Sequence, residues 1–299
     1  METDLPRTIA PALRKAGLRP DPEYFDYIRA RMYHRGELEY EGLLEKAGPE
    51  LEHRVPQAIR LLGFGHVITE FAVAHLGIPG RPNPAVLSLG ALYNLIVSTY
   101  DGLLDSGQDP ERILPRSRVT GTAGKSKAGD LLLGNLVDLY FARLSALPHP
   151  HAAVHQTLRS AIVRMYDAER ATSGPLGYTR TVWRRKSALP IVIMGLPVWM
   201  TVPLLQNCAY RAHLKWLYRL GQFIGWIDDA ADMNADRAAG RPNYFSACAG
   251  PSVARRIARQ GARIVEAWNA GAPRSRYGRT LLETFLAVTW SWLGVQKTY

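Results

Sequence analysis

Two clusters of aspartates have the residue type and spacing that best suit chemistry in this sequence. Asp101 and Asp105 lie four residues apart after an apolar run, and Asp228, Asp232 and Asp236 repeat that spacing. Residues four apart share one face of a helix, so each cluster would place its carboxylates side by side. Like charges at this spacing repel one another by about 0.2–0.5 kcal/mol. A shared divalent cation would remove that repulsion.

The second cluster is the more specific one, because it follows a segment that reads as a buried helix. Residues 223–227 are apolar on all sides, and Asp229 lies beside Asp228. Carboxylates that leave water without a partner are costly, so arginines or a metal must neutralise them. Oxygen ligands with no histidine or cysteine nearby favour Mg²⁺ or Mn²⁺ over zinc. A solvated helix end for the first cluster, and an ion-pair network for the second, are the simpler alternatives.

Two facing acidic clusters imply a phosphate ester, because Mg²⁺ prefers few carboxylates together with phosphate oxygens. Basic residues near the clusters could contact the same phosphate. Lys186 ends a basic run that opens a long apolar stretch, and Arg241 follows the second cluster. Plain solvation of these two cations is the alternative.

The elements that would position these residues are helices. Apolar residues recur at helical spacing over 86–100, 129–147, 152–172, 213–232, 252–269 and 279–293, and alternating strand patterns are nearly absent. The pattern predicts an all-α fold of about ten helices. Residues 1–50 hold more acidic than basic residues. We expect residues 1–50 to form peripheral N-terminal helices that pack on a main helical domain of residues 51–299.

The composition of the 299 residues excludes several classes of protein. Apolar residues make up 47% and charged residues 21%, which is typical of a folded chain and not of a disordered or collagen-like one. Two cysteines are too few for a disulfide scaffold. The net charge of +11 leaves nucleic acid, an anionic membrane surface and a phosphorylated ligand open as partners.

One stretch raises the question of a membrane span. Residues 187–210 carry no charge and are long enough to cross a bilayer. Pro190, Pro197 and Pro203 interrupt the stretch, and proline is costly inside a helix. A buried, kinked core helix therefore fits better, and we expect no integral membrane segment. Residues 1–20 show no secretory pattern, which favours a cytoplasmic protein.

Four motifs, in order, resemble those of the class I isoprenoid synthases, which include trans-prenyl diphosphate synthases and terpene cyclases. Residues 101–105, Asp-Gly-Leu-Leu-Asp, resemble the first aspartate-rich motif, and residues 128–133 resemble a helix that follows it. Tyr178 and residues 186–188 resemble the segment whose lysine binds diphosphate. Residues 222–242 resemble the second motif and its flanks. The resemblance implies a single-domain antiparallel helical bundle around a central cavity.

The resemblance also implies a role for each candidate residue. About three Mg²⁺ ions, with Mn²⁺ as an alternative, would be held by carboxylates of both clusters. Lys186 and Arg241 would contact the diphosphate, and Arg276 with Tyr277 resembles a pair that closes the site in terpene cyclases. The metal ligands expected are Asp101, Asp105, Asp228, Asp229, Asp232 and Asp236, of which Asp101, Asp105, Asp228 and Asp232 are the catalytic candidates.

Departures from the family pattern bear on the reaction. Chain-elongating members carry Gly-Gly-Lys-x-x-Arg near the N-terminus and Arg-Arg-Gly after the first motif. Neither occurs here, in residues 1–60 or 106–112. A site for a second diphosphate is therefore not evident, which favours a terpene synthase. A prenyltransferase that joins an allylic diphosphate to a second acceptor is the alternative.

A terpene synthase would ionise its prenyl diphosphate and enclose the cation in a dry aromatic cavity. Farnesyl or geranylgeranyl diphosphate is the expected substrate, a terpene hydrocarbon or alcohol plus diphosphate the product, and a homodimer is possible. Ordinary core packing is the alternative for each aromatic residue. The candidate walls are Tyr93, Tyr166, Trp183, Trp199, Phe223 and Trp226.

A basic stripe near the C-terminus supports a remote alternative, a nucleic-acid-binding module. Arg255, Arg259 and Arg263 recur every four residues, which would suit a phosphate backbone. No aromatic residues alternate with these arginines in a nucleic-acid-reading motif. A solvated helix face is the simpler interpretation, and we expect no nucleic-acid partner.

Overall fold

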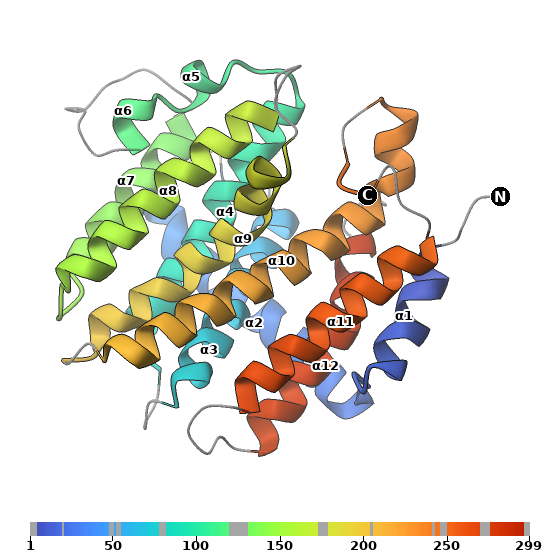
Figure 1. Cartoon of the computed structure of the whole chain (residues 1–299). Coiled ribbons are helices and arrows are strands. Elements are labelled where there is room, and N and C mark those ends of the chain that lie inside the picture. Colours follow the sequence, from blue (N-terminus) through green and yellow to red (C-terminus); the bar gives the residue numbers. More distant parts are fainter. Residues whose placement is uncertain are drawn as a thin grey trace.

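The computed structural model describes residues 5–19, 21–47, 51, 55–77, 82–119, 131–172, 179–203, 206–240, 243–245, 250–269 and 276–295. Every regular element within these ranges is a helix, which confirms the expected all-α fold (Figure 1). The elements are α1 (Leu5–Lys15), α2 (Pro22–Ala47), α3 (Val55–Leu76), α4 (Pro84–Asp105), α5 (Pro110–Ile113), α6 (Arg116–Val119), α7 (Leu131–Ser145), α8 (Ala152–Thr172), α9 (Arg180–Gly195), the 3₁₀-helix η2 (Leu196–Thr201), α10 (Asn207–Ala238), α11 (Gly250–Asn269) and α12 (Arg276–Val295).

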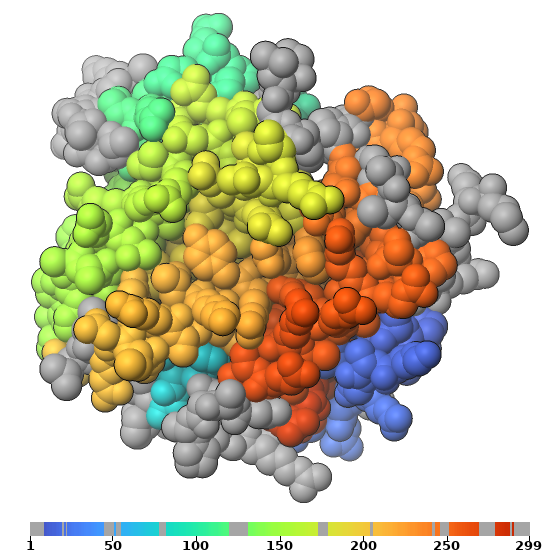
Figure 2. Space-filling model, in the orientation of Figure 1, coloured from blue at the N-terminus to red at the C-terminus, as the bar shows by residue number. Residues whose placement is uncertain are grey.

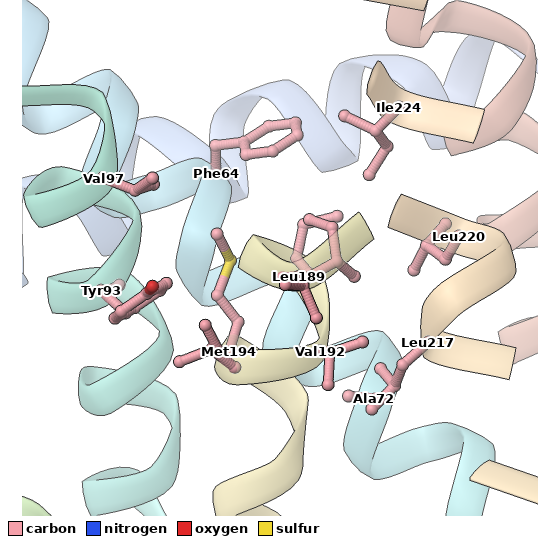
Figure 3. Packing of buried hydrophobic residues seen from close by; sticks show 14 of the residues in the cluster. Phe64, Ala72, Tyr93, Val97, Leu189, Val192, Met194, Leu217, Leu220 and Ile224 are labelled. Carbon is pink, nitrogen blue, oxygen red and sulfur yellow. The ribbon is translucent and has the colours of Figure 1, made fainter. Parts of the chain in front are cut away.

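The hydrophobic core lies where α3, α4, α9 and α10 meet. α3 packs along α4, α9 packs along α10, and α4 crosses α9. Figure 3 shows the interdigitating side chains, which include Phe64 of α3, Tyr93 and Val97 of α4, Leu189 and Met194 of α9, and Leu217 and Ile224 of α10. Side chains fill the space between these helices, so the central cavity implied by the resemblance stays a prediction.

The helices expected within residues 1–50 are present and pack in two places. α2 lies along α3 and buries Ile28, Tyr40 and Leu43. α1 lies against α11 and buries Ile9 and Leu13. The proposed division of the chain at residue 50 stays a prediction.

The first part of the uncharged stretch after Lys186 belongs to the core, with residues 191–200 buried, and its helix is broken. α9 ends at Gly195, and η2 carries the chain on to Thr201. Pro197 lies in the first turn of η2, and its missing N–H prevents the α-helical hydrogen bond that would continue α9. The described helix long and apolar enough to cross a membrane is instead α3, whose most apolar window is 67% buried within the molecule. Such burial is typical of a core helix.

Two glycines bring α10 unusually close to α9. A Cβ atom on Gly221 would lie 2.7 Å from the Cα atom of Ala188, and one on Gly225 would meet the side chain of Ser187. Only glycine permits this approach, because larger side chains would push the helices apart. Lys186 directly precedes Ser187, and Asp228 follows Gly225 by three residues. The close packing therefore places the lysine and the second acidic cluster at the same end of the bundle.

The acidic residues of interest lie at the C-terminal ends of their helices. Asp105 is the last residue of α4, and Asp236 lies in the last turn of α10. The helix dipole disfavours negative charge at this end, so these carboxylates need cations. The segment that follows α4 contains the one-turn helices α5 and α6. Asp109 caps α5 by accepting hydrogen bonds from two backbone N–H groups.

Candidate functional site

Lys186 of α9 lies between two carboxylates from two other helices. Its Nζ atom is 2.7 Å from Oδ1 of Asp101 on α4 and 2.9 Å from Oε2 of Glu169 on α8. The ends of α4 and α8 meet the start of α9 in the upper part of Figure 1. Burial alone would lower the pKa of Lys186, but the two carboxylates outweigh it and raise the pKa. We call Lys186, Asp101 and Glu169 the lysine cluster.

Glu169 is the member of this cluster that the sequence analysis missed. Its side chain is only 3% exposed, and burial raises its pKa to about 7, with Asp101 adding to the increase and Lys186 opposing it. A signal was present in the sequence. Leu158, Ile162 and Met165 form the buried stripe of α8, and Glu169 continues that stripe by one turn. A carboxylate on an apolar stripe indicates a buried partner.

The second acidic cluster faces the same lysine. Burial raises the pKa of Asp229, the negative charges of Asp228 and Asp236 raise it further, and Lys186 together with a backbone hydrogen bond from Tyr244 opposes the shift. The field of Lys186 therefore reaches carboxylates of both predicted clusters. Asp105 is exposed one turn beyond Asp101.

The segment after α10 is fastened to this cluster by Asn243. Its Nδ2 atom donates to the Asp229 carbonyl at 2.7 Å and to the Asp236 carboxylate at 2.9 Å. Its Oδ1 atom accepts from the Phe245 N–H at 2.9 Å. Asn243 therefore holds the chain against the acidic end of α10, where Asp232 is partly buried.

The donor chemistry of the two clusters fits Mg²⁺. Every candidate ligand is a carboxylate oxygen, the type that Mg²⁺ prefers. Among the described residues, no three acidic, histidine or cysteine side chains are already arranged to hold a metal ion by themselves. Mg²⁺ commonly takes one or two protein carboxylates and completes its shell with water and phosphate oxygens. The arrangement thus suits ions that arrive together with a phosphorylated substrate.

An apolar cavity of about 30 Å³ adjoins the lysine cluster. We call it the tyrosine pocket. The negative charge of Glu169 acts on the hydroxyls of Tyr93 and Tyr100, which places the pocket beside the cluster. The pocket is about the size of one water molecule, so a larger ligand would have to displace its side chains. The lining residues are Tyr93, Ile96, Val97, Tyr100, Leu114, Val119, Val137, Tyr140, Phe141, Ile162, Met165 and Tyr166.

Four tyrosines pack in pairs within this pocket. The ring centroids of Tyr100 and Tyr166 are 5.5 Å apart, and those of Tyr93 and Tyr140 are 5.3 Å apart. The Tyr166 hydroxyl donates to the Leu114 carbonyl at 2.7 Å. Tyr93 and Tyr166 were predicted wall residues, whereas Tyr100 and Tyr140 were not. Burial raises the pKa of all four hydroxyls, so the pocket is lined by neutral phenols.

The other predicted aromatic residues lie in three different places. Trp183 stacks on Tyr244 with ring centroids 4.1 Å apart, and Trp226 stacks on the same tyrosine at 6.0 Å. Phe223 points toward α11, where its ring would meet a Cβ atom on Gly261. Trp199 lies in η2, beyond the far end of α9 from Lys186, and donates to His213. The structure therefore does not bring these four residues into the tyrosine pocket.

Some predicted residues fall outside the described parts of the molecule. Arg241 and Tyr178 lie outside the described residues. Arg276 and Tyr277 begin α12, whose backbone is described there without their side chains. Their roles stay predictions.

Comparison with known proteins identifies the fold class of the chain. No protein-family model and no curated protein sequence matches the chain. The crystal structure of geranylgeranyl pyrophosphate synthetase from Pyrococcus horikoshii Ot3 matches with a TM-score of 0.56 and 13% identity, over 88% of this chain and 98% of that one. Geranyltransferase from Legionella pneumophila matches with a TM-score of 0.55 and 13% identity, over 92% and 99% of the two chains. The chain therefore has a class I isoprenoid synthase-like fold.

Proposed function

We propose that this protein is a Mg²⁺-dependent enzyme that ionises an allylic prenyl diphosphate at the lysine cluster. The observation that carries the proposal is the position of Lys186, which pairs with Asp101 and Glu169, acts on Asp229 and lies beside the tyrosine pocket. A cation among carboxylates beside an apolar pocket suits a substrate with a diphosphate head and a hydrocarbon tail.

Each candidate residue would have its own role in this reaction. Asp101 and Asp105, facing Asp228, Asp232 and Asp236, would hold the metal, with Asp229 behind them. When bound, Mg²⁺ would neutralise charge that collects on the departing diphosphate. Lys186 would donate hydrogen bonds to a diphosphate oxygen as the carbon–oxygen bond breaks and its electron pair leaves with the diphosphate. Arg241, Arg276 and Tyr277 are further candidates for contacts with the same anion.

The tyrosine pocket would receive the tail and protect the allylic cation. Ring faces attract cations, and apolar walls exclude water that would trap the cation early. Tyr93 and Tyr140 would have to separate to admit a tail, because the cavity between the helices is small. The length of the tail would then depend on how far these two rings can move.

Transfer of the prenyl group to a second acceptor is the form of this reaction that the comparisons favour. The two solved structures reported above are named as a synthetase and a transferase. One observation favours the terpene synthase as a second candidate. The chain has no Gly-Gly-Lys-x-x-Arg in residues 1–60 and no Arg-Arg-Gly in residues 106–112, so binding groups for a second diphosphate are not evident.

A product assay separates the two reactions. Geranyl, farnesyl, geranylgeranyl and geranylfarnesyl diphosphates would be incubated singly with Mg²⁺, with and without isopentenyl diphosphate, and extracts read by mass spectrometry. A longer diphosphate formed only with the acceptor supports the transferase, whereas a hydrocarbon or alcohol from one substrate supports the terpene synthase. No diphosphate release in any mixture, or full activity in excess EDTA, would contradict the proposal. Cytoplasmic location and a homodimer stay predictions.

A further inference from the structure

A second charged cavity lies on α11, and it is basic. The cavity measures about 270 Å³, and α11 lies beside α10 on the face of the molecule that Figure 2 shows. We call it the arginine pocket. Its lining residues are Trp226, Ser252, Arg255, Arg256, Arg259, Gln260 and Arg263.

The arginine stripe noted in the sequence is therefore the wall of a concave site. Arg255, Arg259 and Arg263 span eight residues, which is roughly 12 Å along the helix axis. Gln260 is 5% exposed and donates to the Arg219 carbonyl of α10 at 3.1 Å. This hydrogen bond fixes α11 against α10 at the pocket. The shape is a groove on a helix pair, which is different from a flat, solvated helix face.

Arg256 is held in place by the aromatic residues at one end of the pocket. Its guanidinium carbon lies 5.7 Å from the ring centroid of Trp226 and 5.5 Å from that of Tyr244. Its Nη1 atom donates to the Tyr244 hydroxyl at 3.2 Å. A guanidinium fixed in this way loses less freedom when it binds an anion, which favours affinity.

Among the residues that the structure describes, these four arginines lack the carboxylate partners that other arginines have. Arg118 pairs with Asp138 at 2.7 Å, and Arg170 pairs with Glu111 at 3.1 Å. Within the described part of the chain, none of the four arginines of the pocket forms an ion pair with a carboxylate. Their positive charges repel one another across a concave surface. An anion from outside the chain would relieve that repulsion.

We propose that the arginine pocket is a binding site for a small anion that carries a phosphate or diphosphate group. Planar guanidinium groups match phosphate oxygens two at a time. The volume approaches the lower end of the range for small-molecule pockets, about 300 Å³, whereas a membrane or a duplex would meet a convex or flat face. The proposal does not rest on the proposed function, because it uses none of the aspartates and not Lys186.

Calorimetric titration with inorganic diphosphate tests the site. EDTA would be present so that metal-dependent binding at the aspartates is excluded. The pocket variant Arg255→Gln/Arg259→Gln/Arg263→Gln should bind diphosphate at least tenfold more weakly than wild type. The control Arg159→Gln/Arg211→Gln/Lys215→Gln removes the same charge at exposed positions outside the pocket, and it should bind as wild type does. Equal affinity in the pocket variant and wild type, or equal losses in both variants, would overturn the proposal.

Two further measurements separate this site from the other anion sources. Sedimentation with phosphatidylglycerol vesicles and titration with a DNA duplex test the macromolecular alternatives. Pocket-dependent binding of either, without pocket-dependent binding of diphosphate, would also overturn the proposal. These outcomes are independent of the product assay, so failure of one proposal leaves the other testable.

Discussion

Lys186 and His66 each lie between two carboxylates, in clusters that differ in how their charges balance. Lys186 is 2.7 Å from Asp101 and 2.9 Å from Glu169. His66 is 3.3 Å from Oε1 of Glu39 and 3.4 Å from Oε1 of Glu70. We call the second group, His66 with its two glutamates, the histidine cluster. It joins α2 to α3.

The carboxylates of the histidine cluster have further partners. Glu39 accepts the Ser88 hydroxyl at 2.7 Å, and Glu70 accepts from Nε of Arg31 at 2.7 Å. Two potential cations therefore meet two anions. In the lysine cluster, Lys186 contacts Asp101 and Glu169 and its charge also acts on Asp229, and Asp101 is 41% exposed. A closed cluster holds helices together, whereas a partly exposed cluster that is rich in carboxylates can bind a metal and its anionic substrate.

The largest expected effect is the loss of activity in Lys186→Met. Methionine keeps the length and apolar stem of lysine but removes the hydrogen bonds to the departing diphosphate. By analogy with the loss of one preorganised donor, turnover should fall by about 10²–10³-fold. Steady-state assay of diphosphate release measures this. The control is Arg31→Met, which removes the arginine that contacts Glu70 and should leave turnover within about twofold, since it lies away from the lysine cluster. Wild-type turnover in Lys186→Met would contradict the assigned role.

The next largest effect is expected for Gly221→Ala, which tests whether close packing of α9 and α10 brings the lysine and the second acidic cluster together. Gly221→Ala places a methyl group 2.7 Å from the Ala188 Cα atom, so α10 must move away from α9. Overpacking of this kind costs about 1–3 kcal/mol, and the proposed activity should fall by about tenfold or more. Denaturant titration and turnover measure both effects. Gly42→Ala is the matched control, because its methyl group meets nothing within 4 Å; it should stabilise α2 by up to about 1 kcal/mol.

A smaller effect is expected for Glu169→Gln. Glutamine keeps the shape of the side chain but removes the charge that orients Lys186, so kcat should fall by about tenfold while KM changes little. The corresponding change in the histidine cluster, Glu39→Gln, should leave both constants unaltered. Equal losses of kcat in the two variants would show that Glu169 acts only through overall stability.

The contrast between the clusters also shows what the sequence could predict. The aspartates stand out because residue type and four-residue spacing place like charges on one helix face, and Lys186 stands out because it ends a basic run before a long apolar stretch. The Gly221 and Gly225 spacing was visible as well, but its consequence depends on which helix lies opposite. Which neighbouring element a helix face contacts is decided by tertiary packing and not by local sequence. Phe223 therefore meets α11 and Trp199 meets His213, although both were predicted to line one cavity.

Glu169 illustrates the same limit for charged residues. Glu169 continues the apolar stripe of α8, but residues 167–170 read Asp-Ala-Glu-Arg, and this local sequence does not say which cation would pair with Glu169. Only the meeting of α4, α8 and α9 gives Glu169 its buried lysine partner. Tyr100 and Tyr140 were missed for the same reason, since apolar helices contain many aromatic residues and their shared pocket arises from packing. Long-range contacts of this kind are not encoded in local spacing.

The smallest expected effect is a pH-dependent change in protein stability that arises from the histidine cluster. Burial would lower the pKa of His66, but hydrogen bonds to Glu39 and Glu70 outweigh it and raise the pKa above 6.5. Burial would raise the pKa of Glu70, but His66 and Arg31 lower it below 4.5. The stabilisation from His66 is therefore complete below pH 6.5 and is lost as pH rises through its raised pKa, whereas that from Glu70 is lost only in acid.

Comparison of wild type with His66→Gln at several pH values tests this balance. The glutamine variant should unfold more easily by about 1–2 kcal/mol between pH 5 and 6, and the difference should shrink by pH 8.5 as His66 loses its proton. Thermal unfolding measures the difference, and turnover at pH 7 should stay near that of wild type because the cluster joins helices and touches no proposed substrate. A difference that grows toward alkaline pH would contradict the raised pKa. Loss of turnover without loss of stability would place His66 in the reaction, and the distinction between the two clusters would fail.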